Sequence, residues 1–334
     1  MKQLLAYCLS IILCVSFTGC MENYLDLYPE DKITSASFPE NESDIKLLLN
    51  GVYAQLREKE VYNQGLFGFG ITDGATPNAF NWGTDEVFNK LGAGRLSSSD
   101  GGVVTYRWKR CYEIISRANY LLACMDLVDL SEEAKAKYSG ETHFLRGLAY
   151  SVLAETYGGV PIILTDISTE EARSLKRASL EETWQQALDD YEVAITNLGV
   201  DAPEPGRATK GAALGMKMRA YLYQGKYKEV LSCVEQIDAL KKYGLFHSYE
   251  GLFDPANENN KEVLFDIQYI EGENSQGSYI DQYCGTGTGS WTRGSRYVPT
   301  DDLVAAYETI DGSPVDPDNP YENRDPRLGF TAVL

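Results

Sequence analysis

The chain has 334 residues, with 30 basic and 49 acidic side chains, so its formal net charge is −19. A chain this acidic repels polyanions, which excludes nucleic acid as an expected partner. With 43% hydrophobic and 24% charged residues there is enough apolar material for a large core, which excludes disorder of the whole chain. Its two histidines, His143 and His247, have no neighbours at ligand spacing, so we expect no histidine-based metal site, no catalytic triad and no cofactor.

The first residues predict a lipoprotein signal peptide. Lys2 precedes an apolar run that is too short to cross a membrane as a helix but suits a signal peptide. The run ends in Phe17-Thr18-Gly19-Cys20, and small residues directly before a cysteine resemble the lipobox of bacterial lipoproteins. We therefore expect a signal peptide over residues 1–19 and lipidation of Cys20, whose acyl chains would anchor the protein on a membrane. An ordinary secretory signal with an incidental cysteine is the alternative.

Four cysteines lie beyond the signal and the anchor, namely Cys111, Cys124, Cys233 and Cys284. Cys111 and Cys124 belong to one predicted helix, where a rise of about 1.5 Å per residue places them about 20 Å apart, too far for a disulfide. No two cysteines have CxxC spacing. We interpret the four as buried thiols, with an opportunistic disulfide as the alternative.

The next part of the chain predicts a tether followed by helices. Residues 20–43 have few periodic apolar positions and indicate an extended tether, whereas residues 44–58 predict a helix. A longer helix starts at Val104, where apolar residues recur in steps of three and four. Ser131 is placed to cap the following helix, which keeps the same spacing until Gly158 ends it. We expect these two helices to pack as an antiparallel pair.

Further helical hairpins follow a linker. Ser179 and Glu182 form a capping box before apolar residues at helical spacing, and the proline-rich residues 201–206 end that helix. A third hairpin begins near Ala208, and residues 220–230 resemble the turn of a tetratricopeptide repeat. The hairpins do not keep the strict period of about 34 residues of that repeat. We therefore predict an irregular superhelix of hairpins over residues 104–242.

Beyond residue 243 the sequence becomes rich in loops. Apolar and polar residues alternate over residues 263–269, which is the period-two pattern of a strand. Thr300 is placed to cap a short helix through Leu303 and Tyr307, and a segment rich in proline and aspartate leads to residue 334.

Four groups of residues occur in one order along the chain. They are Trp108, Tyr112, Ile115 and Asn119; Phe144-Leu145-Arg146-Gly147 with Ala149-Tyr150 and Tyr157-Gly158-Gly159-Val160-Pro161; residues 262–269; and residues 298–312 with Asp325-Pro326-Arg327. Together, and behind a lipobox, they resemble the SusD/RagB family of nutrient-binding lipoproteins of Bacteroidetes. The resemblance covers nearly the whole chain after the signal peptide.

The resemblance implies a mostly α fold: a tetratricopeptide-like, right-handed helical superhelix with long irregular loops and minor β structure. It implies a single domain over residues 44–334, with helical hairpins over about 104–242 and a loop-rich part over 243–334. Family members usually continue well beyond the Asp325-Pro326-Arg327 motif, so we expect this chain to be incomplete at its C-terminus.

The resemblance also implies a function. Members of the family are lipid-anchored, surface-exposed proteins of the outer membrane that capture an oligosaccharide and deliver it to a SusC-like TonB-dependent transporter, without catalysing a reaction. Their ligands range from starch and other glycans to peptides, so the family does not name the ligand of this chain.

Two loops have a composition suited to sugar binding, because aromatic side chains stack on the apolar faces of sugar rings and short polar groups bind the hydroxyls. They span residues 65–100 and 272–296, the regions whose aromatic residues bind the ligand in starch-binding members of the family. The candidate ligand-binding residues are Asp73, Asn78, Asn81, Trp82, Tyr279, Tyr283, Trp291 and Arg293. Trp82 fits a packed position on the scaffold equally well, whereas the glycine-rich surroundings of Trp291 favour binding.

Two other functions remain open. A peptide-binding or scaffolding tetratricopeptide-like module would use the inner face of the superhelix rather than the loops. A glycoside hydrolase comes third. With 49 acidic residues some pair of carboxylates will lie at glycosidase distance by accident, so their abundance does not indicate a catalytic pair.

Overall fold

The computed structural model describes residues 38–58, 61, 73–81, 90–97, 99–269 and 297–331. The chain divides into two compact units, residues 1–40 and 41–334, and every element below belongs to the second. The predicted signal peptide, Cys20 and most of the predicted tether lie outside the described residues. Cys284 does too.

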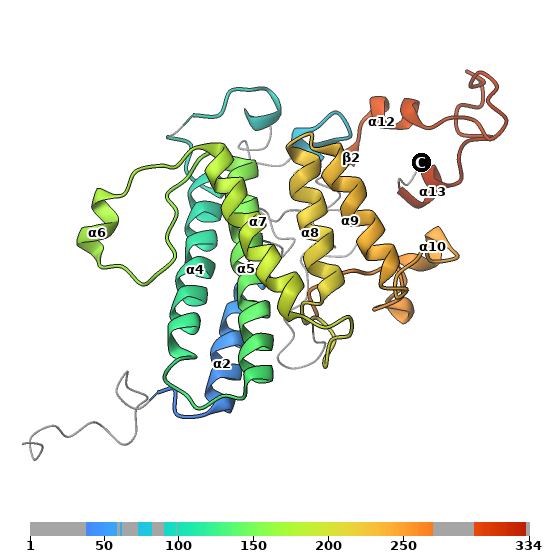
Figure 1. Ribbon diagram of the computed structural model, residues 1–334. Coiled ribbons are helices and arrows are strands. Elements are labelled where there is room, and N and C mark those ends of the chain that lie inside the picture. Colours follow the sequence, from blue (N-terminus) through green and yellow to red (C-terminus); the bar gives the residue numbers. More distant parts are fainter. Residues whose placement is uncertain are drawn as a thin grey trace, which may run out of the picture. The chain divides into compact units, whose positions relative to one another are not determined.

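The described residues are mostly helical, as predicted (Figure 1). The helices and short helical turns are α2 (Glu42–Tyr53), η1 (Ala54–Arg57), α4 (Val103–Cys124), α5 (Glu132–Tyr157), α6 (Thr169–Ser174), α7 (Leu180–Asn197), α8 (Lys210–Tyr223), α9 (Tyr227–Ala239), α10 (Tyr249–Leu252), η3 (Pro255–Asn257), α12 (Asp301–Ala306) and α13 (Arg327–Thr331). Within this part of the chain, no helix combines the length and the apolar character that a membrane crossing needs.

Capping side chains set where the helices begin. Ser131 Oγ accepts a hydrogen bond of 3.1 Å from a first-turn N–H of α5, and Thr300 Oγ1 accepts one of 3.2 Å from α12. On α7 the capping box is reciprocal: Glu182 Oε2 accepts from Ser179 N at 2.7 Å and Ser179 Oγ accepts from Glu182 N at 3.1 Å. These caps, all expected from the sequence, satisfy N–H groups that have no partner within the helix. α2 begins at Glu42, slightly earlier than predicted, because Asn41 Oδ1 accepts a hydrogen bond of 2.9 Å from Ser43 N.

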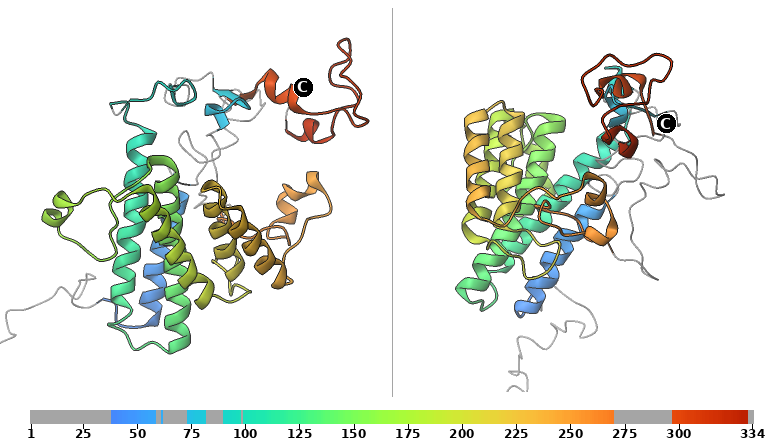
Figure 2. Two further views of the ribbon diagram at one scale, coloured as in Figure 1. Left: turned by 45° about the horizontal axis from the view of Figure 1, so that its top comes forward. Right: turned by 90° about the vertical axis from the view of Figure 1, so that its right-hand side faces the viewer.

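Consecutive long helices pack against one another. α4 packs on α5, α5 on α7, α7 on α8 and α8 on α9, while α2 packs against α4 and α5 (Figure 1). Figure 2 shows the same neighbours from two other directions. Tyr150 and Tyr191 are both fully buried. A Cβ on Gly147 would lie only 3.0 Å from the Tyr191 ring, so this glycine allows α5 and α7 to approach closely.

The residues that carry the family resemblance hold this helical stack together. Asn119 Nδ2 donates to the carbonyl oxygen of Ile163 at 3.0 Å, and Tyr150 Oη donates to the same oxygen at 2.9 Å. Tyr112 Oη donates to the carbonyl oxygen of Pro161 at 2.6 Å. Side chains of α4 and α5 thus satisfy the backbone of the segment that leaves α5, so these motif positions have a structural role.

The cysteines agree with the prediction where the structure describes them. Cys111, Cys124 and Cys233 are free and buried. Burial raises the pKa of each thiol, that of Cys111 to about 12. They are therefore apolar core residues at neutral pH.

The strand predicted over residues 263–269 is wrong, because within the part of the chain that the structure describes this segment joins no sheet. Its alternation is nevertheless real: Phe265 and Ile267 pack on the core, and the Phe265 ring meets Phe144 edge to face with centroids 4.9 Å apart. Alternation reports which face is buried, whereas a sheet also needs a neighbouring strand. The minor β structure lies elsewhere, in β1 (Ala79–Asn81) and β2 (Tyr297–Pro299).

Candidate functional site

A two-stranded antiparallel ladder joins the two loops that the sequence marks as sugar-binding. β1 lies inside the first loop and β2 follows the second directly, and the Cα pairs are Ala79 with Pro299, Phe80 with Val298 and Asn81 with Tyr297. Trp82 comes directly after Asn81 in the sequence, and Arg293 lies four positions before Tyr297. The ladder therefore brings the middle of the first loop beside the segment that directly follows the second loop.

Thr300 fixes the base of this ladder. Its backbone N–H donates to the carbonyl oxygen of Asn78 at 3.1 Å, and its hydroxyl donates to the carbonyl oxygen of Pro77. The same hydroxyl caps α12, so one residue ties the ladder to a helix. In the chain just before β1, Thr76 closes a turn by donating its backbone N–H and its hydroxyl to the carbonyl oxygen of Asp73, at 2.9 and 2.8 Å.

An ion pair joins two described residues near the end of the first loop. Lys90 Nζ lies 2.8 Å from Asp100 Oδ1, and Ser97 N donates to Asp100 Oδ2 at 2.6 Å. The hydrogen bond from Lys90, followed by that from Ser97, lowers the pKa of Asp100 to about 2. Asp100 is therefore ionised at every physiological pH and orders the chain just before α4.

The structure places three of the eight candidate ligand-binding residues. Asp73 and Asn78 have exposed side chains beside the ladder, and Asn81 is the last residue of β1. The side chain of Asn81, and the whole of the other five, lie outside the described residues: Trp82, Tyr279, Tyr283, Trp291 and Arg293. Their grouping around the ladder stays a prediction.

One aromatic residue of this region was missed by the sequence analysis. Phe80 lies in the middle of β1 with half of its side-chain surface exposed (50%), on the face of the ladder that it shares with Val298. An exposed aromatic ring between Asn78 and Asn81 is the combination that sugar binding uses. Its position between two candidate residues was the sequence signal that could have identified it. In a short strand at this position, the side chain of Phe80 would point to one face of the ladder.

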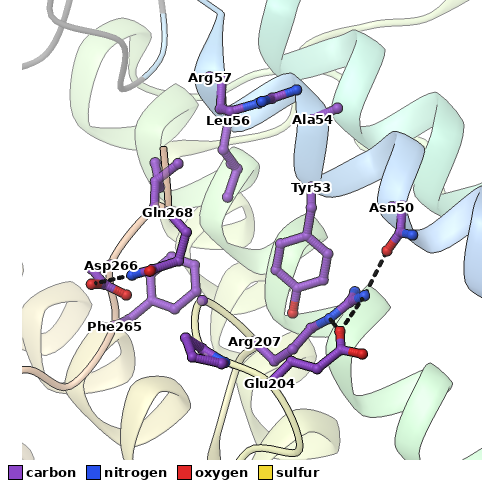
Figure 3. Close-up of a pocket in the computed structure, with 13 residues that line it drawn as sticks. Asn50, Tyr53, Ala54, Leu56, Arg57, Glu204, Arg207, Phe265, Asp266 and Gln268 are labelled. Carbon is purple, nitrogen blue, oxygen red and sulfur yellow. Dashed lines mark hydrogen bonds and ion pairs between the residues drawn. The ribbon is translucent and has the colours of Figure 1, made fainter. Parts of the chain in front are cut away.

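A cavity that no ladder residue lines is shown in Figure 3. It is a cavity of about 370 Å³ between α2 with η1, residues 204–207 and residues 265–268. Arg207 dominates one wall: its Nη2 donates to Asn50 Oδ1 at 2.6 Å and to Glu204 Oε2 at 3.2 Å. The Arg207 guanidinium lies 5.0 Å from the centre of the Tyr53 ring, a cation–π distance.

Behind this wall, Tyr53 and Glu141 are hydrogen-bonded to each other. Tyr53 Oη donates to Glu141 Oε2 at 2.8 Å and accepts from Ala208 N at 2.9 Å. Glu141 is only 2% exposed, and burial raises its pKa despite the hydrogen bond from Tyr53 and the nearby charge of Arg207. Burial and the Glu141 carboxylate also raise the pKa of Tyr53. We interpret this cluster as a clamp that holds residues 204–208 on α2 and α5.

Stacked helical hairpins, with a small ladder between two long loops, define a tetratricopeptide-like helical scaffold. The chain belongs to the SusD-like family: the family model described as "Starch-binding associating with outer membrane" matches residues 23–222. The predicted membership and the predicted helical fold are confirmed.

Relatives and solved structures agree with this assignment. SusD-like protein P25 of Formosa agariphila is 26% identical over 321 residues, which are 89% of this chain and 58% of P25. A SusD-like carbohydrate-binding protein of Bacteroides fragilis superposes with a TM-score of 0.76 at 27% identity, over 86% of this chain and 59% of that one. A laminarin-binding SusD-like protein shares the fold, with a TM-score of 0.62 at 22% identity, over 68% of this chain and 51% of that one. This chain thus spans less than two thirds of each of these proteins.

Proposed function

We propose that this protein captures an oligosaccharide at the cell surface and delivers it to a SusC-like TonB-dependent transporter of the outer membrane. The observation that carries the proposal is the β1–β2 ladder, because it joins two loops rich in aromatic and short polar side chains. The family description names starch binding and association with the outer membrane, and one structural neighbour is named for binding laminarin. Capture and delivery need no catalytic residue.

The proposed site has the chemistry of sugar recognition. Phe80, Trp82 and Trp291 would stack on the apolar faces of sugar rings, as would Tyr279 and Tyr283. Asp73 and Asn78, with Asn81 and Arg293, would bind the hydroxyl groups around each ring. The ladder and Thr300 supply a fixed base, which lowers the entropy that binding must overcome.

Lipidation of Cys20 completes the proposal. After cleavage at residue 19, the acyl chains on Cys20 would hold the protein in the outer membrane and residues 20–43 would connect them to the domain over 44–334. Incorporation of labelled palmitate into the wild type but not into a Cys20→Ala variant tests the anchor. Digestion by protease added to intact cells tests the surface exposure, and co-purification with a SusC-like barrel tests the partner.

Calorimetry on residues 21–334 tests the ligand class. The panel contains α-glucans, β-glucans including laminarin, host glycans and peptides. We expect saturable binding to one glycan class, with affinity at least ten-fold lower for Phe80→Ala and for Trp291→Ala. Tyr227→Ala is the matched control, because Tyr227 is an aromatic residue of α9 that is 68% exposed and lies outside both loops.

Other outcomes would select the alternatives. Binding of peptides but of no glycan, insensitive to Phe80→Ala and Trp291→Ala, would replace this proposal with the peptide-binding module. Progressive shortening of a bound oligosaccharide, abolished by a single carboxylate substitution, would indicate a hydrolase.

A further inference from the structure

Arg57 lines the cavity of Figure 3 with its hydrogen-bonding capacity unused. It is the last residue of η1 and is partly buried, and among the described residues its guanidinium donates no hydrogen bond and forms no ion pair. A guanidinium presents its N–H donors in a planar fork that matches the two oxygens of a carboxylate. Arg57 is therefore a donor group beside a cavity, without an acceptor in the described part of the chain.

The carboxylate of Glu204, which lines the same cavity, is already bound by two other cations. Arg207 donates to Glu204 Oε2 from both Nε and Nη2, each at 3.2 Å. Lys46 Nζ lies 2.7 Å from Glu204 Oε1. The Nη1 of Arg207 makes no hydrogen bond and lies 3.6 Å from Glu141 Oε2. The acceptors on this side of the cavity are thus engaged by Arg207 and Lys46, and Arg57 has none left.

The charges around this side of the cavity favour an anion. The wall at α2 and the layer behind it contain five charged groups, namely Lys46, Arg57, Arg207, Glu141 and Glu204. Three are cations and two are carboxylates, which leaves a surplus of one positive charge. Asp266 belongs to the wall formed by residues 265–268 and accepts a hydrogen bond of 2.6 Å from Gln268 Nε2 (Figure 3). The chain as a whole is acidic, but salt screens its distant surface charges beyond about 10 Å.

The rest of the lining suits a ring that carries hydroxyl groups. Tyr53 and Phe265 supply aromatic rings, while Asn50 and Gln268 supply amides (Figure 3). The volume of about 370 Å³ lies within the range of small-molecule sites, roughly 300–1,000 Å³. A simple carboxylate would leave the aromatic rings without contact, and an acyl chain would leave the amides without partners. A sugar ring that bears a carboxylate satisfies the rings, the amides and Arg57 together.

We propose that this cavity, between α2 with η1, residues 204–207 and residues 265–268, is a binding site for a uronic acid unit. The carboxylate of the sugar accepts hydrogen bonds from Arg57, and its ring packs against Tyr53 and Phe265. No residue of the β1–β2 ladder lines the cavity, so the site is separate from the two loops. The inference goes beyond the proposed function and does not rest on it.

Nuclear magnetic resonance on residues 21–334 tests the proposal at the guanidinium itself. The Nε–H signal of Arg57 is assigned by its absence from the spectrum of Arg57→Gln. We expect glucuronate or galacturonate to shift this signal with saturation in a titration. Glucose has the ring without the carboxylate, and acetate has the carboxylate without the ring. Each should bind at least ten-fold more weakly than the better of the two uronates.

Three variants locate the site, with uronate affinity measured by calorimetry. Arg57→Gln removes the charge and should weaken binding at least ten-fold. Ala54→Phe fills part of the cavity while keeping Arg57, and should weaken binding to a similar degree. Arg173→Gln is the matched control, because Arg173 is an arginine of α6 whose side chain is 75% exposed and does not line the cavity. Equal melting temperatures show that the three variants fold.

Several results would overturn the proposal. They are no shift of the Arg57 signal by either uronate, equal affinity for acetate or for a short peptide with a free C-terminal carboxylate, and uronate binding that survives Arg57→Gln. Uronate binding that Phe80→Ala and Trp291→Ala abolish but Arg57→Gln does not would place the uronate at the loops, so this inference would fail while glycan capture by the loops stood. Uronate binding that depends on Arg57 but not on the loop residues supports the separate site.

Discussion

Arg146 binds both carboxylate oxygens of Asp190, with Nε 3.0 Å from Oδ2 and Nη2 2.7 Å from Oδ1. The two side chains are 7% and 2% exposed, and the remaining Nη1 donates to Asn119 Oδ1 at 2.8 Å. One guanidinium thereby joins α4, α5 and α7 inside the core. The arginine that carries part of the family resemblance is thus a structural residue.

Replacing Arg146 with alanine should be strongly destabilising. The Asp190 carboxylate would remain buried without its partner, so we expect the free energy of unfolding to fall by about 3–5 kcal/mol. Chemical denaturation of residues 21–334 measures it. The double variant Arg146→Met, Asp190→Leu removes both charges and should recover much of the loss. Arg173→Ala is the control, because its pair with Glu170 is exposed and should contribute under about 1 kcal/mol. Equal effects of Arg146→Ala and Arg173→Ala would contradict this account.

Two identical capping boxes should differ in their effect on stability. Ser179→Ala removes the cap of α7, a long helix that packs on α5 and α8, and should lower the free energy of unfolding by about 1 kcal/mol. Ser168→Ala removes the matching box of α6, which buries no residue, so only local hydrogen exchange in α6 should rise. Urea denaturation compares the two. The interpretation fails if Ser168→Ala lowers global stability as much as Ser179→Ala.

Glu141 should make stability depend on pH in the direction opposite to most carboxylates. Burial raises its pKa above the ordinary 4.5, so the folded state holds the proton more tightly than the unfolded state. The stability that protonated Glu141 contributes to the folded state is complete below pH 4.5 and is lost as pH rises through the folded-state pKa. The unfolding free energy of wild type minus that of Glu141→Gln should therefore decrease as pH rises from roughly 4 to 7.

Asp325 should make the stability depend on pH in the opposite direction to Glu141. A hydrogen bond from Arg327 lowers its pKa to about 2, so its contribution is present above its ordinary value of 3.8 and is lost as pH falls toward 2. The difference between wild type and Asp325→Asn should change only in that acid range. A rise with pH in the Glu141 series would show that this carboxyl group is not protonated preferentially in the folded state.

The buried thiols should be unreactive until the protein unfolds. In residues 21–334 carrying Cys284→Ser, the remaining cysteines are Cys111, Cys124 and Cys233, all buried and with raised pKa values. A chromogenic disulfide reagent at pH 8 should label them slowly in buffer and completely in denaturant. Rapid labelling of the native protein would show that at least one of these thiols is accessible.

Local rules account for what could be predicted from the sequence. Ser131, Ser179 and Thr300 cap the helices that they were expected to cap, and the spacing of apolar residues located the long helices to within a few residues. Each of these signals acts between residues three or four positions apart, so the sequence contains both partners.

The candidate site needed contacts between distant parts of the chain. Sequence composition indicated two loops, but only the tertiary structure pairs Asn81 with Tyr297 and leaves Phe80 exposed between two candidate residues. The clamp of Tyr53, Glu141 and Arg207 likewise gathers residues from α2, α5 and the loop before α8. No local pattern specifies such partners, because register between distant segments is chosen by which faces become buried together.

Residues 263–269 show most clearly what the sequence determines and what only the tertiary structure decides. Its alternation, which the sequence alone determined, correctly places Phe265 and Ile267 against the core. Whether its backbone pairs was decided only by the tertiary structure, because a strand's hydrogen bonds belong to a neighbour that lies elsewhere in the chain.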